Sequence, residues 1–257
     1  MSKLAPQDKF FDLSDYGRLP ATIFAQQLKK TAFTPIHVTL LFGVVGLLAA
    51  FCILKGYFWQ AGVLLILKSI IDAADGELAR IKNTPSYTGR YLDSVFDFIL
   101  NFIFLICIDY TFKIPLWITL GAFVSIELQG TLYNYYYLIL RYISIGGDVT
   151  SKIFEVESPV AFPNEEQKWV NLLFFFYTIF YRIYDKIIHF LDTDAYKSKG
   201  FPNWFMTLVS MYGLGFHLLI MAFMLAFGLG QYISVFFIGY NFFIIVLIGI
   251  RKRFIAL

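Results

Sequence analysis

Long apolar runs, separated by short polar segments, make up most of this chain. A helix of about 20 residues crosses a hydrocarbon core of roughly 30 Å, and six of the runs are long enough to do so. They cover residues 36–54, 57–78, 91–112, 114–139, 204–227 and 231–250. The pattern therefore predicts an all-α integral membrane protein with six transmembrane helices.

A seventh run, residues 167–191, is apolar only in its first half. Charged and polar side chains interrupt its second half at Arg182, Asp185, Lys186 and His189. A helix with one charged face prefers to lie in the membrane interface rather than across the membrane. We therefore expect an aromatic-rich interfacial helix at 167–191, between spans four and five.

The basic residues favour six spans over seven. With six, both chain ends and the segments 80–90 and 141–203 share one side, and only Lys55 and Lys113 lie on the other. Seven spans would translocate the basic end 251–253. Since basic residues accumulate on the cytoplasmic side, both ends are expected in the cytoplasm, with the protein in the plasma (inner) membrane if its source is bacterial.

The composition agrees with this class. Of the 257 residues, 58% are hydrophobic and 15% charged, as in a polytopic membrane protein, and we expect no nucleic-acid partner. Residues 1–33 are predicted to be a cytoplasmic leader that ends in a juxtamembrane amphipathic helix at about 21–30. Residues 34–257 are the transmembrane domain, and Thr34 and Pro35 suit its first N-cap and first helical position.

Four aspartates stand close together in this apolar chain. Asp72 and Asp75 share a helical face near the end of span two, because a spacing of three returns to the same side of a helix. Asp93 and Asp97 share a face near the start of span three for the same reason. Segment 82–86 breaks the helical pattern, so it can be the hairpin that lets the two faces meet. Carboxylates near hydrocarbon are costly, which indicates a functional site.

The chemistry of the cluster indicates a metal and a phosphate. Two carboxylates from each of two helices make an all-oxygen site that suits Mg²⁺ or Mn²⁺, as one ion or a pair. Gly76 and Gly89 leave room for a backbone or a ligand to come close. Arg80 offers a planar guanidinium to phosphate oxygens. The alternative is that the aspartates only solvate the helix ends.

The whole string D-x2-D-G-x2-A-R-x8-G-x3-D-x3-D resembles the signature of the CDP-alcohol phosphotransferase (CDP-alcohol phosphatidyltransferase) family. Its defined positions are Asp72, Asp75, Gly76, Ala79, Arg80, Gly89, Asp93 and Asp97. The resemblance extends to the six spans, to the juxtamembrane helix and to residues 34–39, which are similar to the Thr-Pro-Asn-x-x-Thr opening of the family's first span. Here His37 stands in place of the Asn.

The resemblance implies a phospholipid-synthesising transferase that moves a phosphatidyl group from CDP-diacylglycerol to a small polar alcohol and releases CMP. The implied ligands of two divalent ions, Mg²⁺ or Mn²⁺, are Asp72, Asp75, Asp93 and Asp97. Asp97 is also the implied general base, and Asp93 is catalytic with it. The implied cradle of the CDP moiety is Gly76, Ala79, Arg80 and Gly89. A homodimer in the lipid bilayer, with its active site facing the cytoplasm, is implied as well.

A polar stripe on span four indicates where the acceptor alcohol binds. Its members recur at helical spacing and are Glu127, Thr131, Asn134, Leu138 and Arg141. Membrane helices keep such stripes turned inward. We expect Asn134 and Arg141 to line the acceptor pocket and Lys68 of span two to form an ion pair with Glu127 at its border. The alternative is a purely structural polar lock between helices.

Few basic residues are available to bind a phosphorylated acceptor. They are Arg141, Lys82, Arg90 and Lys152, so we favour an unphosphorylated alcohol. The remaining polar residues of the spans, Asn101, His217 and Asn241, are interpreted as hydrogen-bonding groups between helices.

Three other functions fit parts of the pattern. The same signature serves enzymes that transfer a phospho-headgroup from CDP-choline or CDP-ethanolamine to diacylglycerol. Intramembrane prenyltransferases also hold a diphosphate with aspartates and Mg²⁺, but their motifs lie far apart in sequence. A divalent-cation transporter would carry ionisable residues through the whole depth of the membrane rather than at one end.

Overall fold

The chain is built of helices joined by short connections, and no strand occurs among the residues that the structure describes. This computed structural model describes residues 4–147, 150 and 155–255. The α-helices in these ranges are α1 Arg18–Leu28, α2 Pro35–Leu54, α3 Phe58–Lys82, α4 Tyr87–Thr111, α5 Leu116–Ile145, α6 Gln167–Leu191, α7 Asn203–Val209, α8 Leu214–Ala226, α9 Ile233–Tyr240 and α10 Phe242–Phe254. Short 3₁₀ helices lie at Pro6–Asp8, Leu13–Asp15, Ala195–Lys197, Ser210–Tyr212 and Gly230–Tyr232.

Local sequence explains where the helices around the aspartates begin and end. Thr34 caps α2 as expected: its hydroxyl accepts from the His37 N–H at 3.3 Å, and His37 Nδ1 accepts from the Thr34 N–H at 3.0 Å. α3 ends before Asn83, which adopts the left-handed conformation with φ 52°. Ser86 caps α4 by accepting from the Gly89 N–H at 2.8 Å. The hairpin predicted between the two aspartate-bearing helices is therefore confirmed.

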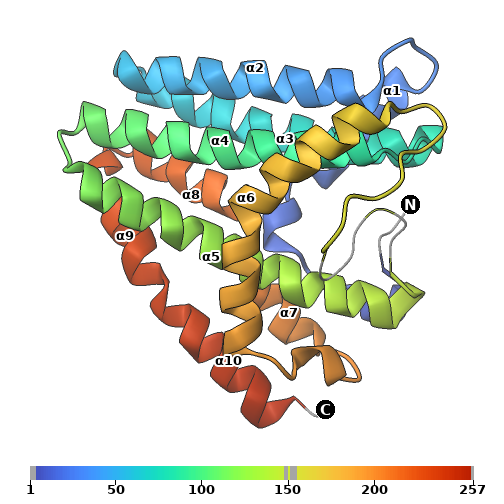
Figure 1. Cartoon of the computed structure of the whole chain (residues 1–257). Helices are drawn as coiled ribbons and strands as arrows, with labels where there is room; N and C mark the ends of the chain where they lie inside the picture. Colours follow the sequence, from blue (N-terminus) through green and yellow to red (C-terminus); the bar gives the residue numbers. More distant parts are fainter. Residues whose placement is uncertain (1–3, 148–149, 151–154, 256–257) are drawn as a thin grey trace.

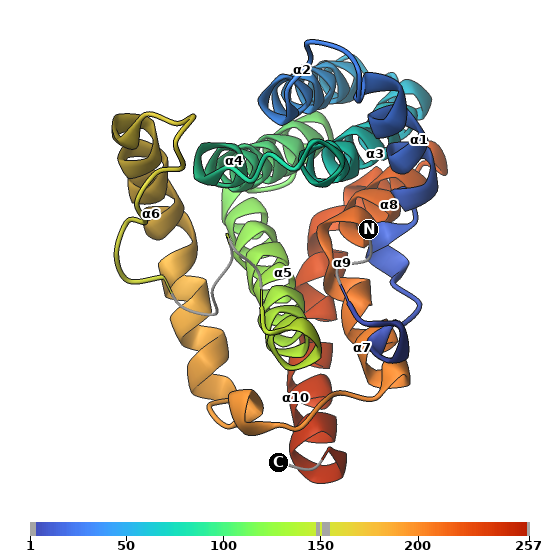
Figure 2. The same ribbon diagram turned by 90° about the vertical axis from the view of Figure 1, so that its right-hand side faces the viewer.

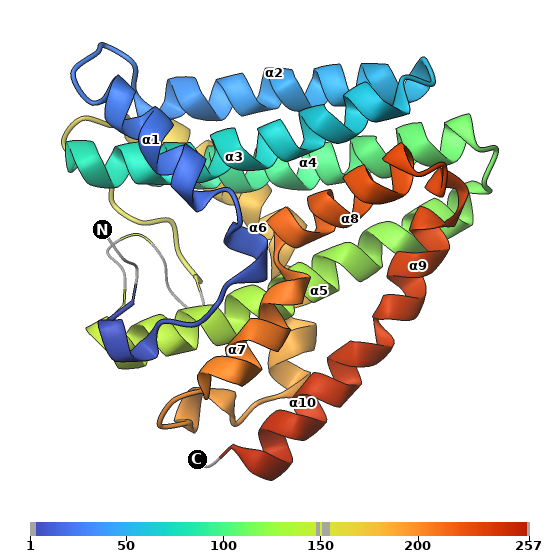
Figure 3. The same cartoon turned by 180° about the vertical axis from the view of Figure 1, so that it is seen from behind.

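Helices α2, α3 and α4 lie side by side and nearly parallel (Figure 1). From behind, α1 lies against α3, and α8 packs along α3 beneath it (Figure 3). Turned by 90°, α6 stands on the side of the molecule where it contacts α4 and α5 (Figure 2). The aspartates of α3 and α4 are thus surrounded by α1, α5, α6 and α8.

Buried apolar side chains form two clusters. The first joins α1, α2, α3, α4 and α8 with the beginning of α5 and with α9, around residues such as Phe42, Leu65 and Phe104. The second joins the later part of α5 with α7, α10 and the end of α6, around residues such as Tyr136 and Phe205. α5 belongs to both clusters, so it connects the two halves of the molecule.

In the described part of the chain, three helical segments are apolar and long enough to cross a membrane: Pro35–Leu54, Tyr87–Thr111 and Gly230–Phe254. A fourth candidate is the pair Asn203–Tyr212 and Leu214–Ala226, which is bent by 55°. α3 and α5 have 25 and 30 residues, enough to span, but they carry the polar side chains of the site. The protein is of the helical membrane type. Its six-span count, the surface position of α1 and the interfacial position of α6 stay predictions.

Candidate active site

The two aspartate faces meet where α3 runs beside α4. Carboxylate oxygens of Asp72, Asp75 and Asp93 all lie within 4.8 Å of one another. Helical spacing placed each pair on one face, and the α3–α4 hairpin turned the faces toward each other. The predicted meeting of the two faces is therefore confirmed for Asp72, Asp75 and Asp93.

Side chains of α2 and α3 hold two of these carboxylates in place. The Thr39 hydroxyl of α2 donates to Asp75 Oδ2 at 2.6 Å. The ammonium group of Lys68, one turn before Asp72 on α3, donates to Asp72 Oδ2 at 2.7 Å and forms a second ion pair with Asp97 of α4. Lys68 is fully buried and its Nζ lies 4.4 Å from the centre of the Phe42 ring. One cation thus bridges the two aspartate-bearing helices.

The carboxylate cluster fits a divalent metal. Its donors are all oxygens, the type that Mg²⁺ and Mn²⁺ prefer. Asp93 Oδ1 is buried and has no hydrogen-bond partner in the described structure. A buried carboxylate oxygen without a partner is costly, and coordination to a cation removes that cost. Asp72, Asp75 and Asp93 are the residues that would hold the ion.

The prediction of an ion pair between Lys68 and Glu127 was wrong. Lys68 is held by Asp72 and Asp97 instead, and Glu127 accepts a hydrogen bond from Asn101 Nδ2 at 3.1 Å. The physical reason is distance: Asp72, one turn along the same helix, and Asp97 on α4 both lie nearer to the Lys68 ammonium group than Glu127 does. Lys68 is consequently absent from the described lining of the cavity, whereas Glu127 belongs to it.

The remaining motif residues lie near the loop that joins α3 and α4. Arg80 forms an ion pair with Glu77 at 2.8 Å and also lines the cavity. A Cβ atom on Gly89 would lie 3.1 Å from the hydroxyl oxygen of Ser86, which is the cap of α4. On Gly76 it would make only ordinary contacts with the Arg80 side chain. Gly89 is thus required locally for the cap, while the roles of Gly76 and Ala79 toward a nucleotide stay predictions.

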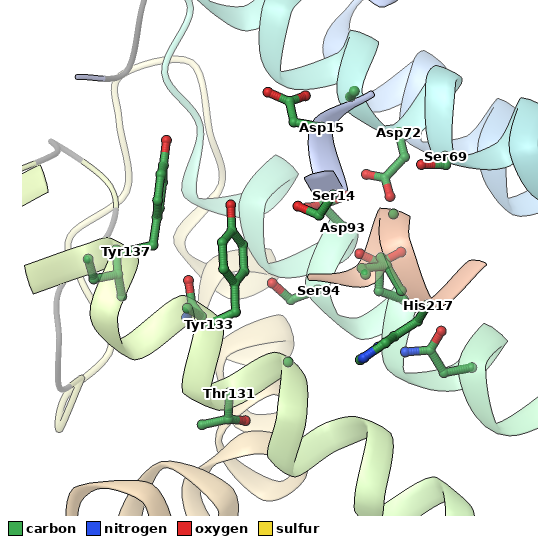
Figure 4. Close-up of a pocket in the computed structure, with 18 of the residues that line it drawn as sticks. Ser14, Asp15, Ser69, Asp72, Asp93, Ser94, Thr131, Tyr133, Tyr137 and His217 are labelled. Carbon is green, nitrogen blue, oxygen red and sulfur yellow. The ribbon is translucent and has the colours of Figure 1, made fainter. Parts of the chain in front are cut away.

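A cavity of about 470 Å³ opens beside the aspartates. Its walls come from α3, α4, α5, α6 and α8, and in Figure 4 Asp72, Asp93 and His217 converge on one space. Asn134 and Arg141, expected in the acceptor pocket, both line it. A volume of this size is in the range of small-molecule sites, roughly 300 to 1,000 Å³.

The N-terminal segment supplies another wall, which the sequence did not indicate. Asp12, Ser14, Asp15 and Arg18 line the cavity, and Figure 4 shows Ser14 and Asp15 beside the aspartates. The Tyr133 hydroxyl donates to Asp12 Oδ2 at 2.6 Å, and the Leu13 N–H donates to Ser210 Oγ at 2.9 Å. The only signal in the sequence was the pair of glycines against which this segment packs, Gly213 and Gly215.

The segment before α6 contacts the start of α4. Arg90 forms an ion pair with Glu155, and the Tyr91 hydroxyl donates to Glu155 at 2.5 Å. Arg90 is therefore already paired, and the ammonium group of Lys82 donates to the backbone oxygens of Thr31 and Phe33. Lys152 lies outside the described residues. Of the four basic residues considered for binding a phosphorylated acceptor, Arg90 and Lys82 thus already have other partners.

A second carboxylate from this segment sits on the N-terminus of α4. Glu165 accepts from the Ser86 hydroxyl at 2.7 Å and from the N–H groups of Tyr87 and Thr88 at 3.2 and 2.7 Å. Partial burial acts to raise the pKa of Glu165, but these hydrogen bonds outweigh it and hold the pKa below its usual value. The helix start next to the motif is thereby anchored to the chain that precedes α6.

Comparison with known proteins agrees with the signature. Residues 32–226 match the family described as CDP-alcohol phosphatidyltransferase. Two relatives are each named bifunctional IPC transferase and DIPP synthase. The one from Aquifex aeolicus is 38% identical over 87 residues, and the one from Thermococcus kodakarensis is 38% identical over 85 residues. Each match covers 33% of this chain but only 19% of the relative, so the chain spans about a fifth of the length of these relatives.

Proposed function

Because this chain belongs to the CDP-alcohol phosphatidyltransferase family, we propose that it moves a phosphatidyl group from CDP-diacylglycerol to a small polar alcohol and releases CMP. The observation that carries the proposal is the convergence of Asp72, Asp75 and Asp93 beside a polar cavity, with the complete family signature on the same hairpin. That combination supplies the charge neutralisation and the space that displacement at phosphorus needs.

The motif residues would bind the metal ions and the CDP moiety of the donor. Asp72, Asp75, Asp93 and Asp97 would hold Mg²⁺ or Mn²⁺. Bound divalent ions would neutralise the oxygens of the diphosphate. Gly76, Ala79, Arg80 and Gly89 would hold the CDP moiety near the loop that joins α3 and α4, where Arg80 lines the cavity.

Asp97 is the proposed general base. It lies one turn beyond Asp93 on α4 and lines the cavity, so its carboxylate can accept the proton of an alcohol bound there. The ion pair with Lys68 fixes its orientation. Asp93 would act beside Asp97: it would be a ligand of the metal and would lie next to the reacting phosphate.

The donor is the part of the proposal that the signature leaves open. The Asp-Gly-Glu-x-Ala-Arg form of residues 75–80 favours CDP-diacylglycerol. The second candidate is transfer of a phospho-headgroup from CDP-choline or CDP-ethanolamine to diacylglycerol. We further propose six spans, an active site that faces the cytoplasm and a homodimer.

A direct assay tests the reaction. Purified protein is given CDP-diacylglycerol, Mg²⁺ or Mn²⁺ and a panel of labelled alcohols, and CMP and lipid product are followed. We expect CMP release that requires both the metal and an alcohol. Activity only with CDP-choline or CDP-ethanolamine plus diacylglycerol would reverse the donor assignment, and metal flux into vesicles without CMP release would support a cation transporter instead.

Asp97→Asn tests the base. Turnover should fall by about a hundredfold or more, the scale of general-base assistance, while binding of CDP-diacylglycerol persists. Asp109→Asn is the matched control, because Asp109 is a buried aspartate of the same helix that accepts hydrogen bonds from Ser234 and does not line the cavity. Substantial turnover in Asp97→Asn would remove it as the base.

A further inference from the structure

The cavity continues past the aspartates to a deep polar end. This end is formed by Asn101 of α4, Glu127 of α5 and His217 of α8, all of which line the cavity. Their exposed fractions are 6%, 5% and 1%. Three buried polar side chains from three helices therefore line one cavity, in a place where a membrane protein normally buries apolar side chains.

Two of these side chains present atoms with no partner. Asn101 Oδ1 and His217 Nε2 are buried and make no hydrogen bond in the described part of the chain. Asn101 uses its Nδ2 to donate to Glu127 at 3.1 Å, which leaves its Oδ1 without a partner among the described residues. The His217 ring is held against Phe237, with the ring centres 5.3 Å apart. Leaving buried polar atoms without partners is costly, so a cavity lined by two such side chains is suited to bind a polar ligand.

The chemistry of the three groups matches hydroxyls. A hydroxyl both donates and accepts, and the deep end offers an amide oxygen, a carboxylate and an imidazole nitrogen. Several hydroxyls on one small molecule could satisfy all three at once.

Charge argues against a phosphate on that molecule. Among the described lining residues seven are acidic: Asp12, Asp15, Asp72, Asp93, Asp97, Glu127 and Asp185. Four are arginines, and three of those are already in ion pairs, Arg18 with Asp15, Arg80 with Glu77 and Arg90 with Glu155. A phosphate would add about 1.5 to 2 negative charges to a cavity that must already accept a diphosphate.

We propose that Asn101, Glu127 and His217 form the subsite that binds the hydroxyl groups of an unphosphorylated polyol, the acceptor of the transferred group. The inference rests on the proposed function, which supplies the donor and the chemistry. It assigns the acceptor class and gives His217, first interpreted as a hydrogen-bonding group between helices, a role in selecting the acceptor.

The test compares free polyols with their phosphates. The full chain, in detergent or nanodiscs, is assayed with CDP-diacylglycerol and Mn²⁺ against glycerol, myo-inositol, glycerol 3-phosphate and myo-inositol 1-phosphate. We expect the best free polyol to exceed its monophosphate in kcat/KM by about tenfold or more, which corresponds to about 1.4 kcal/mol.

Variants of the deep end separate acceptor binding from a structural role. His217→Leu and Glu127→Gln should each raise the KM for the polyol by about tenfold, while the KM for CDP-diacylglycerol changes little. His217→Gln, which restores a hydrogen-bonding group, should recover part of the loss. Gln129→Leu is the matched control: Gln129 is a buried amide on the same helix as Glu127, but it bonds to Phe237 and Asn241 outside the cavity.

The outcomes distinguish the inference from the reaction it depends on. A preference for the phosphorylated alcohols, or an unchanged polyol KM in His217→Leu with the protein still folded, would overturn the inference and leave the proposed reaction standing. If the wild-type chain neither binds CDP-diacylglycerol nor releases CMP with any alcohol, the proposed function fails, and the acceptor assignment fails with it.

Discussion

At the scale of single residues, the ammonium group of Lys68 allows the aspartates of α3 and α4 to lie close together. Lys68 is fully buried, and its ammonium group contacts Asp72 of α3 and Asp97 of α4. Without a cation between them, carboxylates on two packed helices would repel each other in a medium of low dielectric constant. The lysine therefore organises the site before any metal is considered.

Removing this ammonium group tests its role. Lys68→Met should lower the free energy of unfolding by about 3 kcal/mol, because breaking a buried ion pair leaves its partners uncompensated, and turnover should fall by about tenfold or more because Asp97 loses its orientation. Thermal unfolding and CMP release measure the two effects.

Addition of a metal ion and a control variant at a surface lysine complete that test. Mn²⁺ should restore part of the lost stability of Lys68→Met, since the freed carboxylates bind the cation and binding to the folded state stabilises it. Lys55→Met, at an exposed position after α2, should change neither quantity. Normal turnover and an unchanged unfolding temperature in Lys68→Met would contradict the organising role.

At the scale of elements, α4 depends on chain that comes long after it. Glu165 holds the N–H groups of Tyr87 and Thr88 and the Ser86 hydroxyl, so it acts as a second cap beside the motif. A negative charge at a helix N-terminus is favourable. The start of α4 and the segment before α6 are therefore coupled.

The pH dependence of this contact has a definite sign. The pKa of Glu165 is lowered from its ordinary value of 4.5, so its stabilisation is present above that value and is lost as the pH falls through the lower value of the folded state. The hydrogen-exchange protection of residues 155–166, which compares the observed rate with that of an unfolded chain at the same pH, should thus fall on acidification below about pH 4.5 in the wild-type chain. In Glu165→Gln this protection should be low already at neutral pH and depend less on pH.

Glu166→Gln is the control for this prediction. Glu166 is the exposed neighbour of Glu165 and pairs with Lys168 on the surface, where ion pairs contribute little. Its exchange profile should follow the wild type. If Glu165→Gln also follows the wild type, the carboxylate does not anchor the segment.

The N-terminal segment depends in the same way on two glycines of the α8 region. A Cβ atom on Gly215 would lie 1.9 Å from the backbone oxygen of Ser14, and one on Gly213 would lie 2.3 Å from the Ser14 side chain. Glycine is required here because the two backbones approach so closely. This approach brings Asp12 and Asp15 to the cavity.

Enlarging the glycine should displace the segment. Gly215→Ala is expected to increase hydrogen exchange of residues 10–18 and to reduce turnover by about tenfold, because overpacking of this kind costs roughly 1 to 3 kcal/mol. Gly239→Ala, where nothing lies within 4 Å of the added atom, should leave both unchanged. Full activity of Gly215→Ala with an exposed N-terminal segment would show that the segment is dispensable.

At the scale of the whole molecule, the polar cavity lies between two apolar clusters. One is centred on α2, α3, α4 and α8 and the other on α5, α7 and α10. Each cluster shields one side of the site from lipid, as the cost of exposed carboxylates in hydrocarbon demands. The position of α6 across α4 and α5 (Figure 2) closes a further side.

The predicted position of α6 at the interface can be tested by accessibility. In a background without Cys52 and Cys107, single cysteines at Lys55, Leu116 and Lys199 are labelled from either side of sealed vesicles. Six spans place the first two on one side and Lys199 on the other. Labelling of all three from the same side would mean that α6 crosses the membrane.

The sequence by itself determined the parts of the site that depend on local rules. Spacings of three and four residues put each pair of aspartates on one face, and Thr34 predicted the start of α2, because helical periodicity and capping act over a few residues. The hairpin between α3 and α4 is also local, which is why the meeting of the two faces could be predicted.

Only the tertiary structure decided which distant groups complete the site. The ion pair between Lys68 and Asp97, the wall made by Asp12 and Ser14, and the deep end with His217 all join residues from different elements. No periodicity in the chain encodes such contacts, because they depend on how far each helix reaches and on which glycines let backbones approach. The expected Lys68 to Glu127 pair failed for that reason: spacing gave the right faces, but only packing selects which carboxylate is nearest.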